Sequence, residues 1–184
     1  DLAYAAASYT RDNLADQLQR YAYSGVAAVL SLGTDPGEMP FSQRVEQERT
    51  GGTLLLLAGK GLAGPNAGPG DAALKPSAWS VATEAEARNA VRQEAARGVD
   101  FIKVWVDDRG GTVKKTPPEI YRAIIDEAHK RKLRAIAHVF YLDDAKDLAR
   151  SGIDGFAHLI RDREVDDEII ALIKQHGIFV MPNL

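Results

Sequence analysis

The sequence contains no cysteine among its 184 residues. This absence excludes disulfides, thiolate nucleophiles and Cys-ligated zinc, so any metal ion must be bound by histidine, by carboxylates or by a modified side chain. Apolar runs of the roughly 20 residues that span a membrane are also missing, and the opening segment DLAYAAASYTRDN lacks the basic start of a signal peptide. We therefore expect no membrane partner, while the compartment stays undetermined.

A predominance of one sign of charge is absent too. The 23 basic and 26 acidic residues give a formal net charge of −3 without a long run of either sign, which argues against a nucleic-acid partner. Hydrophobic residues make up 45% of the chain, an ordinary share for a globular protein with one sizeable core. We expect one domain over residues 1–184 and a small-molecule or peptide substrate.

Phosphate-binding glycine motifs are the third absence. The segment from Gly59 to Ser80 is rich in Gly and Pro, but it contains no Gly-Lys-Ser/Thr ending and no GxGxxG that opens a helix. A connection of this length either shapes a binding site or is a surface excursion. The sequence assigns no role to Lys60 and Trp79, which lie near its two ends.

One pattern recurs along the chain: a polar amphipathic segment, then a small residue or glycine, then an apolar run opened by a β-branched residue. It occurs as YSGVAAVLSL from Tyr23, ARGVDFIKVWV from Ala96, RSGIDGFAHLI from Arg150 and QHGIFVMPNL from Gln175. Each glycine suits the end of a helix, and each run suits a strand that is buried on both faces. The runs TLLLLAG from Thr53 and LRAIAHVF from Leu133 complete six strand candidates.

Helical spacing of apolar residues separates these strands. It predicts helices over Asn13–Tyr23, Glu84–Arg97, Glu119–Arg131, Asp143–Ser151 and Asp167–His176. Two capping boxes are predicted, Thr83 with Glu86 and Thr116 with Glu119, the second with Pro117 at the first helical position. Helices that alternate with buried strands predict an α/β fold with a parallel sheet.

A lysine interrupts the apolar run FIKVWV. Because successive strand residues point to opposite faces, Lys103 shares a face with Phe101 and Trp105, while Ile102, Val104 and Val106 occupy the other. Three explanations are open: the lysine extends to the rim, it is a desolvated amine that forms a Schiff base, or CO₂ converts it to a carbamate. A carbamate is an anionic ligand that can bridge two cations, which explains neighbouring histidines better than a Schiff base does.

Two histidines lie on the next two predicted strands. His138 shares a face with Ile136, and His158 is predicted to share a face with Phe156. A lone strand histidine is more often a core or rim residue than a ligand, but two on successive strands beside a lysine strand favour metal binding, because neutral imidazole is a good zinc ligand. The other histidines, His129 and His176, belong to helical segments, and we expect them to be solvated.

These residues resemble the amidohydrolase superfamily of metal-dependent hydrolases, particularly its imidazolonepropionase-like and prolidase-like members. The similarity extends through most of the chain and is most specific in the ordered trio Lys103, His138 and His158. In that family, these positions correspond to the carboxylated lysine on the fourth strand and to metal-binding histidines on the fifth and sixth. The resemblance implies a TIM-type parallel (β/α) barrel with its site at the carboxyl ends of the strands.

The resemblance also implies a mechanism and a cofactor. One or two divalent ions, expected to be zinc, would polarise a substrate carbonyl and activate a water that attacks it, cleaving an amide-like C–N bond. Lys103, through its CO₂-derived carbamate, would bridge the metals as the catalytic lysine, and His138 with His158 would hold one of them. Tyr141 and Arg161 follow the histidine strands and are candidate substrate contacts, whereas Asp107 and Asp108 are expected to be loop or capping residues.

Two parts of the family pattern are missing from the sequence. No His-x-His pair, expected on the first strand, is present, and the run that resembles the seventh strand is the last, so no eighth-strand Asp follows. The chain opens without Met, and we expect a fragment with about strands 2 to 7 of 8 and weak or no activity alone. Open strand edges would favour a homo-oligomer or a complementing segment that closes the barrel. Alternatives are a Schiff-base lyase or aldolase that uses Lys103, and a non-catalytic metal- or ligand-binding half-barrel.

Overall fold

A computed structural model of the chain describes residues 10–35, 37–70 and 72–182. The helices are α1 (Arg11–Tyr23), α2 (Met39–Thr50), α3 (Glu84–Ala96), α4 (Pro118–Lys130), α5 (Leu142–Arg150) and α6 (Asp167–His176), with a 3-10 helix over Ala72–Ser77. The strands are β1 (Ala28–Ser31), β2 (Leu54–Leu57), β3 (Leu62–Ala63), β4 (Trp79–Ser80), β5 (Phe101–Val106), β6 (Arg134–Val139), β7 (Gly155–Phe156) and β8 (Phe179–Val180). The molecule is therefore an alternating α/β protein, as predicted.

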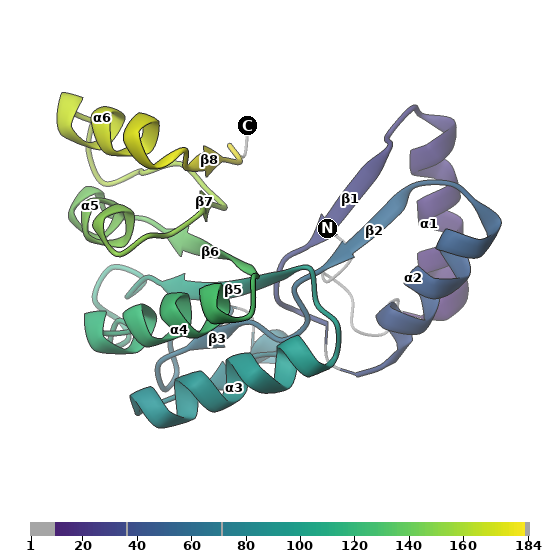
Figure 1. Cartoon of the computed structure of the whole chain (residues 1–184), viewed down its shortest axis with the longest axis horizontal. Coiled ribbons are helices and arrows are strands. Elements are labelled where there is room, and N and C mark those ends of the chain that lie inside the picture. The colour runs from purple at the N-terminus through teal and green to yellow at the C-terminus, as the bar shows by residue number, and fades with distance from the viewer. Residues whose placement is uncertain (1–9, 36, 71, 183–184) are drawn as a thin grey trace.

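Every strand pair is parallel. β1 pairs with β2, and a six-stranded sheet has the order β4-β3-β5-β6-β7-β8. The short segment between β2 and β3 joins the two sheets, because the amide of Gly61 donates to the carbonyl of Gly33 at 2.8 Å. Helices α3 to α6 follow one another along the larger sheet, while α1 and α2 accompany β1 and β2 (Figure 1).

The six predicted strands are all present, as β1, β2, β5, β6, β7 and β8, and the five predicted helices are α1 and α3 to α6. The structure adds α2, together with β3, β4 and the 3-10 helix inside the predicted long loop. The end of the last predicted run, residues 183–184, and the start of the chain, residues 1–9, lie outside the described residues. Within the described ranges, no helix has the length and hydrophobicity needed to cross a membrane.

The two predicted capping boxes have different outcomes. At α3 the prediction is confirmed: the Thr83 hydroxyl accepts from the Glu86 amide, and the Glu86 carboxylate accepts from the Thr83 amide. At α4 it is wrong, because Pro117 is the N-cap and the helix begins at Pro118. Thr116 is instead buried, where its hydroxyl bridges backbone groups of two strand segments.

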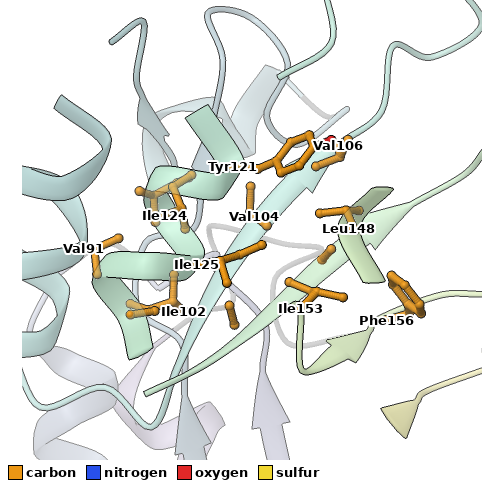
Figure 2. Packing of buried hydrophobic residues seen from close by; sticks show 14 of the residues in the cluster. Val91, Ile102, Val104, Val106, Tyr121, Ile124, Ile125, Leu148, Ile153 and Phe156 are labelled. Carbon is orange, nitrogen blue, oxygen red and sulfur yellow. The ribbon is translucent and has the colours of Figure 1, made fainter. Parts of the chain in front are cut away.

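The hydrophobic core lies between the strands and the helices that follow them. Ile102, Val104 and Val106 of β5 are fully buried in one cluster with Ile124 and Ile125 of α4 (Figure 2). Burying a branched side chain of this size contributes about 1.5–3 kcal/mol. The predicted alternation along β5 is therefore confirmed, and it leaves Lys103 and Trp105 on the face opposite this core.

Candidate functional site

Lys103 occupies the middle of β5 and is enclosed by the protein. Only 2% of the residue is exposed, and its Nζ lies 5.7 Å from the centre of the Trp105 ring. Two glycines allow this packing: a Cβ at Gly33 would lie 2.8 Å from Cγ of Lys103, and a Cβ at Gly61 would lie 3.1 Å from it. The lysine therefore does not extend to the solvent at the rim, which excludes the first of its three explanations.

Burial changes the chemistry of this amine. Removing the ammonium from water lowers the pKa of Lys103 from its ordinary value to about 7. Near neutral pH, a large fraction of the side chain is then the neutral amine, which has a lone pair that can attack a carbonyl or CO₂. The arrangement is compatible with both remaining explanations, a carbamate and a Schiff base.

His138 and His158 lie together beside this lysine. Their ring centres are 4.5 Å apart and their planes are nearly perpendicular, at 73°. Burial is the largest cause that lowers the pKa of His138 to about 4; electrostatic repulsion from Lys103 and His158 contributes in the same direction, while Asp107 opposes the shift. His138 is therefore a neutral imidazole at neutral pH, the form in which histidine binds metal ions. The structure thus brings together the trio that the sequence singled out.

The predicted face of His158 is wrong in one respect. β7 ends at Phe156, and Phe156 packs in the core with Leu148 and Ile153 (Figure 2). His158 follows the strand, where a period of two no longer applies, so its ring contacts His138 although Phe156 belongs to the helix-side core. His129 and His176 lie on helices with exposed side chains, as expected, and Nε2 of His129 lies 2.9 Å from Oδ2 of Asp154.

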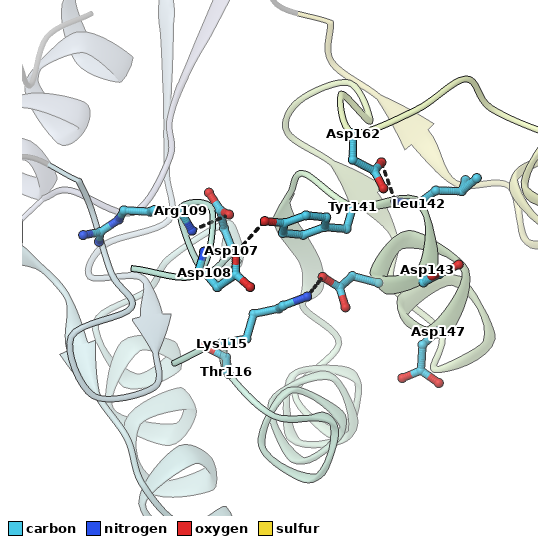
Figure 3. Close-up of polar contacts among 12 residues, drawn as sticks. Asp107, Asp108, Arg109, Lys115, Thr116, Tyr141, Leu142, Asp143, Asp147 and Asp162 are labelled. Carbon is cyan, nitrogen blue, oxygen red and sulfur yellow. Dashed lines mark hydrogen bonds and ion pairs between the residues drawn. The ribbon is translucent and has the colours of Figure 1, made fainter. Parts of the chain in front are cut away.

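The turn after β5 contacts three different segments, and Figure 3 shows its contact with Tyr141. Asp107 Oδ2 lies 3.2 Å from Nε2 of His138, and Asp108 Oδ1 accepts from the hydroxyl of Tyr141 at 2.6 Å. The guanidinium of Arg109 donates to backbone carbonyls of the loop that precedes the 3-10 helix, including that of Pro69 at 3.0 Å. Three consecutive residues therefore fix the positions of a β6 histidine, of the residue that precedes α5, and of a distant loop.

The sequence interpretation of this turn captured only part of its role. Asp107 accepts from the Arg109 amide at 2.9 Å and Asp108 from the Gly111 amide at 3.1 Å, so both acids are loop-capping residues, as expected. Their contacts with His138 and Tyr141 were missed. The sequence signal that could have indicated these contacts is the pair of adjacent acids directly after the strand that carries Lys103.

The two candidate substrate contacts lie in different surroundings. Tyr141 is held by Asp108, which also raises the pKa of its hydroxyl, and Nζ of Lys115 lies 4.2 Å from its ring centre. Arg161 is exposed, and its guanidinium lies 5.0 Å from the ring of Phe140. Tyr141 is thus linked to His138 through the Asp107–Asp108 turn, whereas Arg161 stacks on the residue before Tyr141.

Lys60 and Trp79, to which the sequence gave no role, contact each other. Nζ of Lys60 lies 5.0 Å from the centre of the Trp79 ring, and the indole Nε1 donates to Glu94 at 2.8 Å. Glu94 is fully buried and also accepts from Arg97. These partly buried residues form a polar cluster around Glu94 that attaches α3 to the β2–β4 region, which is a structural role.

The described residues do not assemble a metal site from unmodified side chains alone. Among residues 10–35, 37–70 and 72–182, no three or more His, Cys, Asp or Glu side chains gather in a group that could hold a metal ion. A metal site here requires a ligand of another kind, such as a carboxylated Lys103, or ligands outside these ranges.

Comparisons with solved structures agree on one fold. No family model matches the chain. An uncharacterized protein of Mycobacterium tuberculosis is 32% identical over 105 residues, which cover 55% of this chain and 28% of that protein. A prolidase-like protein from Bifidobacterium longum has a similar solved structure, with 27% identity, a TM-score of 0.73 and coverage of 91% of this chain and 40% of that one.

Two further solved structures give the same result. An amidohydrolase is 25% identical, with a TM-score of 0.70 and coverage of 94% of this chain and 46% of that one. A Xaa-Pro dipeptidase is 24% identical, with a TM-score of 0.71 and coverage of 93% and 46%. The chain therefore spans less than half the length of these TIM-barrel neighbours. In fold and in part of its sequence, the chain resembles the prolidase-like proteins and amidohydrolases of the amidohydrolase superfamily.

Proposed function

We propose that this chain is part of a metal-dependent hydrolase that cleaves amide-like C–N bonds in peptides, cyclic amides or related molecules. The observation that supports it most strongly is the enclosure of Lys103, as an amine with a pKa of about 7, beside two histidines whose rings lie 4.5 Å apart. Hydrolases of the amidohydrolase superfamily among the similar structures support the same reaction class.

The proposed modification of Lys103 follows from its burial. The neutral amine adds to the carbon of CO₂: a new N–C bond forms, one C=O π bond opens to an anionic oxygen, and the nitrogen releases one proton, so that a carbamate anion replaces the neutral amine. The carbamate introduces a buried negative charge, which is costly unless a cation pairs with it. A divalent ion would satisfy this requirement, and this links the lysine chemistry to the metal.

The residues present fit such an ion. The Lys103 carbamate, His138 and His158 would hold one or two divalent ions, expected to be zinc, because anionic oxygen and neutral imidazole are ligands that zinc accepts. When bound, the ion supplies Lewis acidity toward the substrate carbonyl and lowers the pKa of a coordinated water. Asp107, which contacts Nε2 of His138, would orient that imidazole.

Tyr141 and Arg161 are the proposed substrate contacts. The Tyr141 hydroxyl is held by Asp108 and its ring lies beside Lys115, so its side chain is positioned before a substrate arrives. Arg161 is exposed and offers a guanidinium to an anionic group. Tyr141 follows β6, which carries His138, and Arg161 follows His158 in the segment after β7. Both lie beyond the carboxyl ends of strands, where parallel α/β proteins bind their substrates.

A Schiff-base lyase or aldolase is the second candidate, because the lowered pKa of Lys103 also favours imine formation. The amine would attack a ketone or aldehyde carbonyl, and loss of water would leave a C=N bond. Reduction with borohydride in the presence of a carbonyl substrate would then add mass at Lys103. A carbamate cannot form an imine, so the two candidates give opposite results in this trapping experiment.

The test of the main proposal combines elemental analysis with carbon NMR. The gel-filtered chain, prepared with ¹³C-bicarbonate, is assayed for zinc, manganese, iron and nickel and for a carbamate resonance. Lys103→Met, which keeps a long apolar stem, should lose both signals, while His176→Ala, an exposed helical histidine, should keep both. The same metal content in Lys103→Met and His176→Ala, with no carbamate resonance in either, would exclude Lys103 as a ligand. The elution volume also reports whether the chain forms an oligomer.

A further inference from the structure

A cavity of about 620 Å³ opens between the end of β4 and the start of α4. Val81, directly after β4, and Ile120, in the first turn of α4, form one part of its wall, and the loop after β5 contributes Val113, Lys114 and Lys115. Small-molecule sites usually have volumes of about 300–1,000 Å³. The cavity is therefore large enough to accept a small organic ligand.

The charge of the lining has one sign. Among the residues that the structure describes, Lys114 and Lys115 are the only charged ones that line the cavity, and none of these lining residues is acidic. Nζ of Lys115 is already paired with Asp144 at 2.7 Å (Figure 3). Lys114 is exposed, and among the described residues it forms no ion pair. Lys114 therefore contributes an uncompensated positive charge to a lining that also includes the apolar side chains of Val81, Val113 and Ile120.

We propose that this cavity binds a small monocarboxylate with an apolar body. The apolar part would lie against Val81, Val113 and Ile120, which gains the favourable free energy of removing both surfaces from water. The carboxylate would remain at the edge and pair with Lys114. A single negative charge fits best, because a dianion would have to compete with Asp144 for Lys115.

The position of the cavity connects it to the rest of the molecule. Lys115 lines the cavity and also lies 4.2 Å from the ring centre of Tyr141. The same loop contains Asp108, which accepts from the Tyr141 hydroxyl. A ligand in the cavity therefore contacts a loop that also holds Tyr141, although its binding does not depend on the proposed hydrolase reaction.

The test uses two probes with the same body and opposite charges, 4-phenylbutyrate and 4-phenylbutylamine, titrated into the ¹⁵N-labelled chain. The carboxylate should shift the amides of residues 81–82, 112–115 and 119–120, and the amine should bind more weakly. Lys114→Gln should weaken carboxylate binding about two- to fivefold, the usual size of an exposed ion pair. Lys174→Gln, an exposed lysine on α6, is the matched control and should have no effect.

A charge reversal inside the cavity makes the test sharper. Val113→Asp places a carboxylate among the apolar walls and should abolish 4-phenylbutyrate binding while 4-phenylbutylamine still binds. Unchanged dispersion of the other amide resonances confirms that the variant is folded; if it is not, the exposed Lys114→Gln variant still decides. Equal affinities for the two probes, or equal effects of Lys114→Gln and Lys174→Gln, would overturn the proposal.

Discussion

Asp107 Oδ2 lies 3.2 Å from Nε2 of His138, so a turn after β5 fixes the ring of a β6 residue. A carboxylate has no hydrogen to donate, and the lowered pKa of His138, about 4, makes this imidazole neutral at neutral pH. The contact is then a hydrogen bond only if Nε2 carries the proton. Nδ1 is left with a free lone pair for a cation, and this is how a neighbouring carboxylate sets the chemistry of a histidine.

The tautomer of His138 is therefore a prediction. Imidazole ¹⁵N–¹H correlations at pH 7.5 should show a proton on Nε2 in the wild type. Asp107→Ala should shift His138 toward a mixture of the two tautomers, because the acceptor that selects one of them is gone. Asp143→Ala removes an exposed acid that pairs with Arg163, and it should leave the His138 spectrum unchanged. Protonation on Nδ1 in the wild type would contradict the assignment.

Because of Lys103, the free energy of unfolding should depend on pH in the neutral to alkaline range. Its pKa is about 7 in the folded chain and near 10.5 when unfolded, so between these values the unfolded state binds more protons and stability rises with pH. The slope from this one group is about 1.4 kcal/mol per pH unit. Below pH 7 both states are protonated, and the cost of burying the charge is constant.

Lys103→Met should remove this slope. In bicarbonate-free buffer, urea unfolding should show the variant to be more stable than the wild type at pH 7, by a few kcal/mol, with the difference shrinking toward pH 10.5. Lys174→Met provides the matched control, since Lys174 is exposed on α6 and its substitution should leave the pH profile unchanged. Parallel profiles for wild type and Lys103→Met would show that Lys103 binds the same number of protons in the folded and unfolded states, and would contradict the lowered pKa.

The sequence predicted the parts of the fold that repeat a pattern over several residues. Alternation along β5 placed Ile102 in the core and Lys103 opposite to it, and both positions are confirmed. The two-residue strands β3 and β4 are too short to show any period, and α2 is predominantly polar, so neither was predictable from spacing. Short or polar elements are determined by tertiary contacts instead.

In the candidate site, too, the residues marked by a local sequence pattern were predicted, and those defined by distant contacts were not. Lys103, His138 and His158 were predicted because each interrupts an apolar run, a signal that lies within a few residues. The roles of Asp107 and Trp79 depend on partners 31 and 15 residues away, His138 and Glu94, and no local pattern records such a pairing. Residues that act through a distant partner need the folded structure to be identified.

Gly61 should be intolerant of any side chain. A Cβ at this position would overlap the ring of Trp105 and approach Cγ of Lys103. Gly61→Ala should therefore cost about 1–3 kcal/mol through overpacking, measured by urea unfolding, with a changed Trp fluorescence spectrum. Gly70→Ala is the control, because a Cβ there meets only Nε of Arg109, at 3.9 Å. Equal stabilities of the two variants would mean that the Trp105 ring can move aside.

Thr116 was predicted to cap α4, but in the structure its hydroxyl joins two backbone groups instead. Its hydroxyl donates to the carbonyl of Trp105 at 2.7 Å and accepts from the amide of Gly64 at 2.8 Å, in a buried position. Thr116→Val keeps the shape but leaves both backbone groups without this partner, at about 1–3 kcal/mol for each group. Thr116→Ser keeps the hydroxyl and should be close to the wild type.

Hydrogen exchange decides between the two roles of Thr116. If the hydroxyl bridges the strands, Thr116→Val should speed exchange at the Gly64 amide and leave the first turn of α4 protected, because the Ile120 amide donates to the carbonyl of Pro117. If it caps the helix, exchange should rise at the start of α4 instead. Thr112→Val, which removes an exposed loop hydroxyl, controls for loss of the group alone. We expect the first result, because the two bonds of the Thr116 hydroxyl join the Gly64 amide to the Trp105 carbonyl of β5.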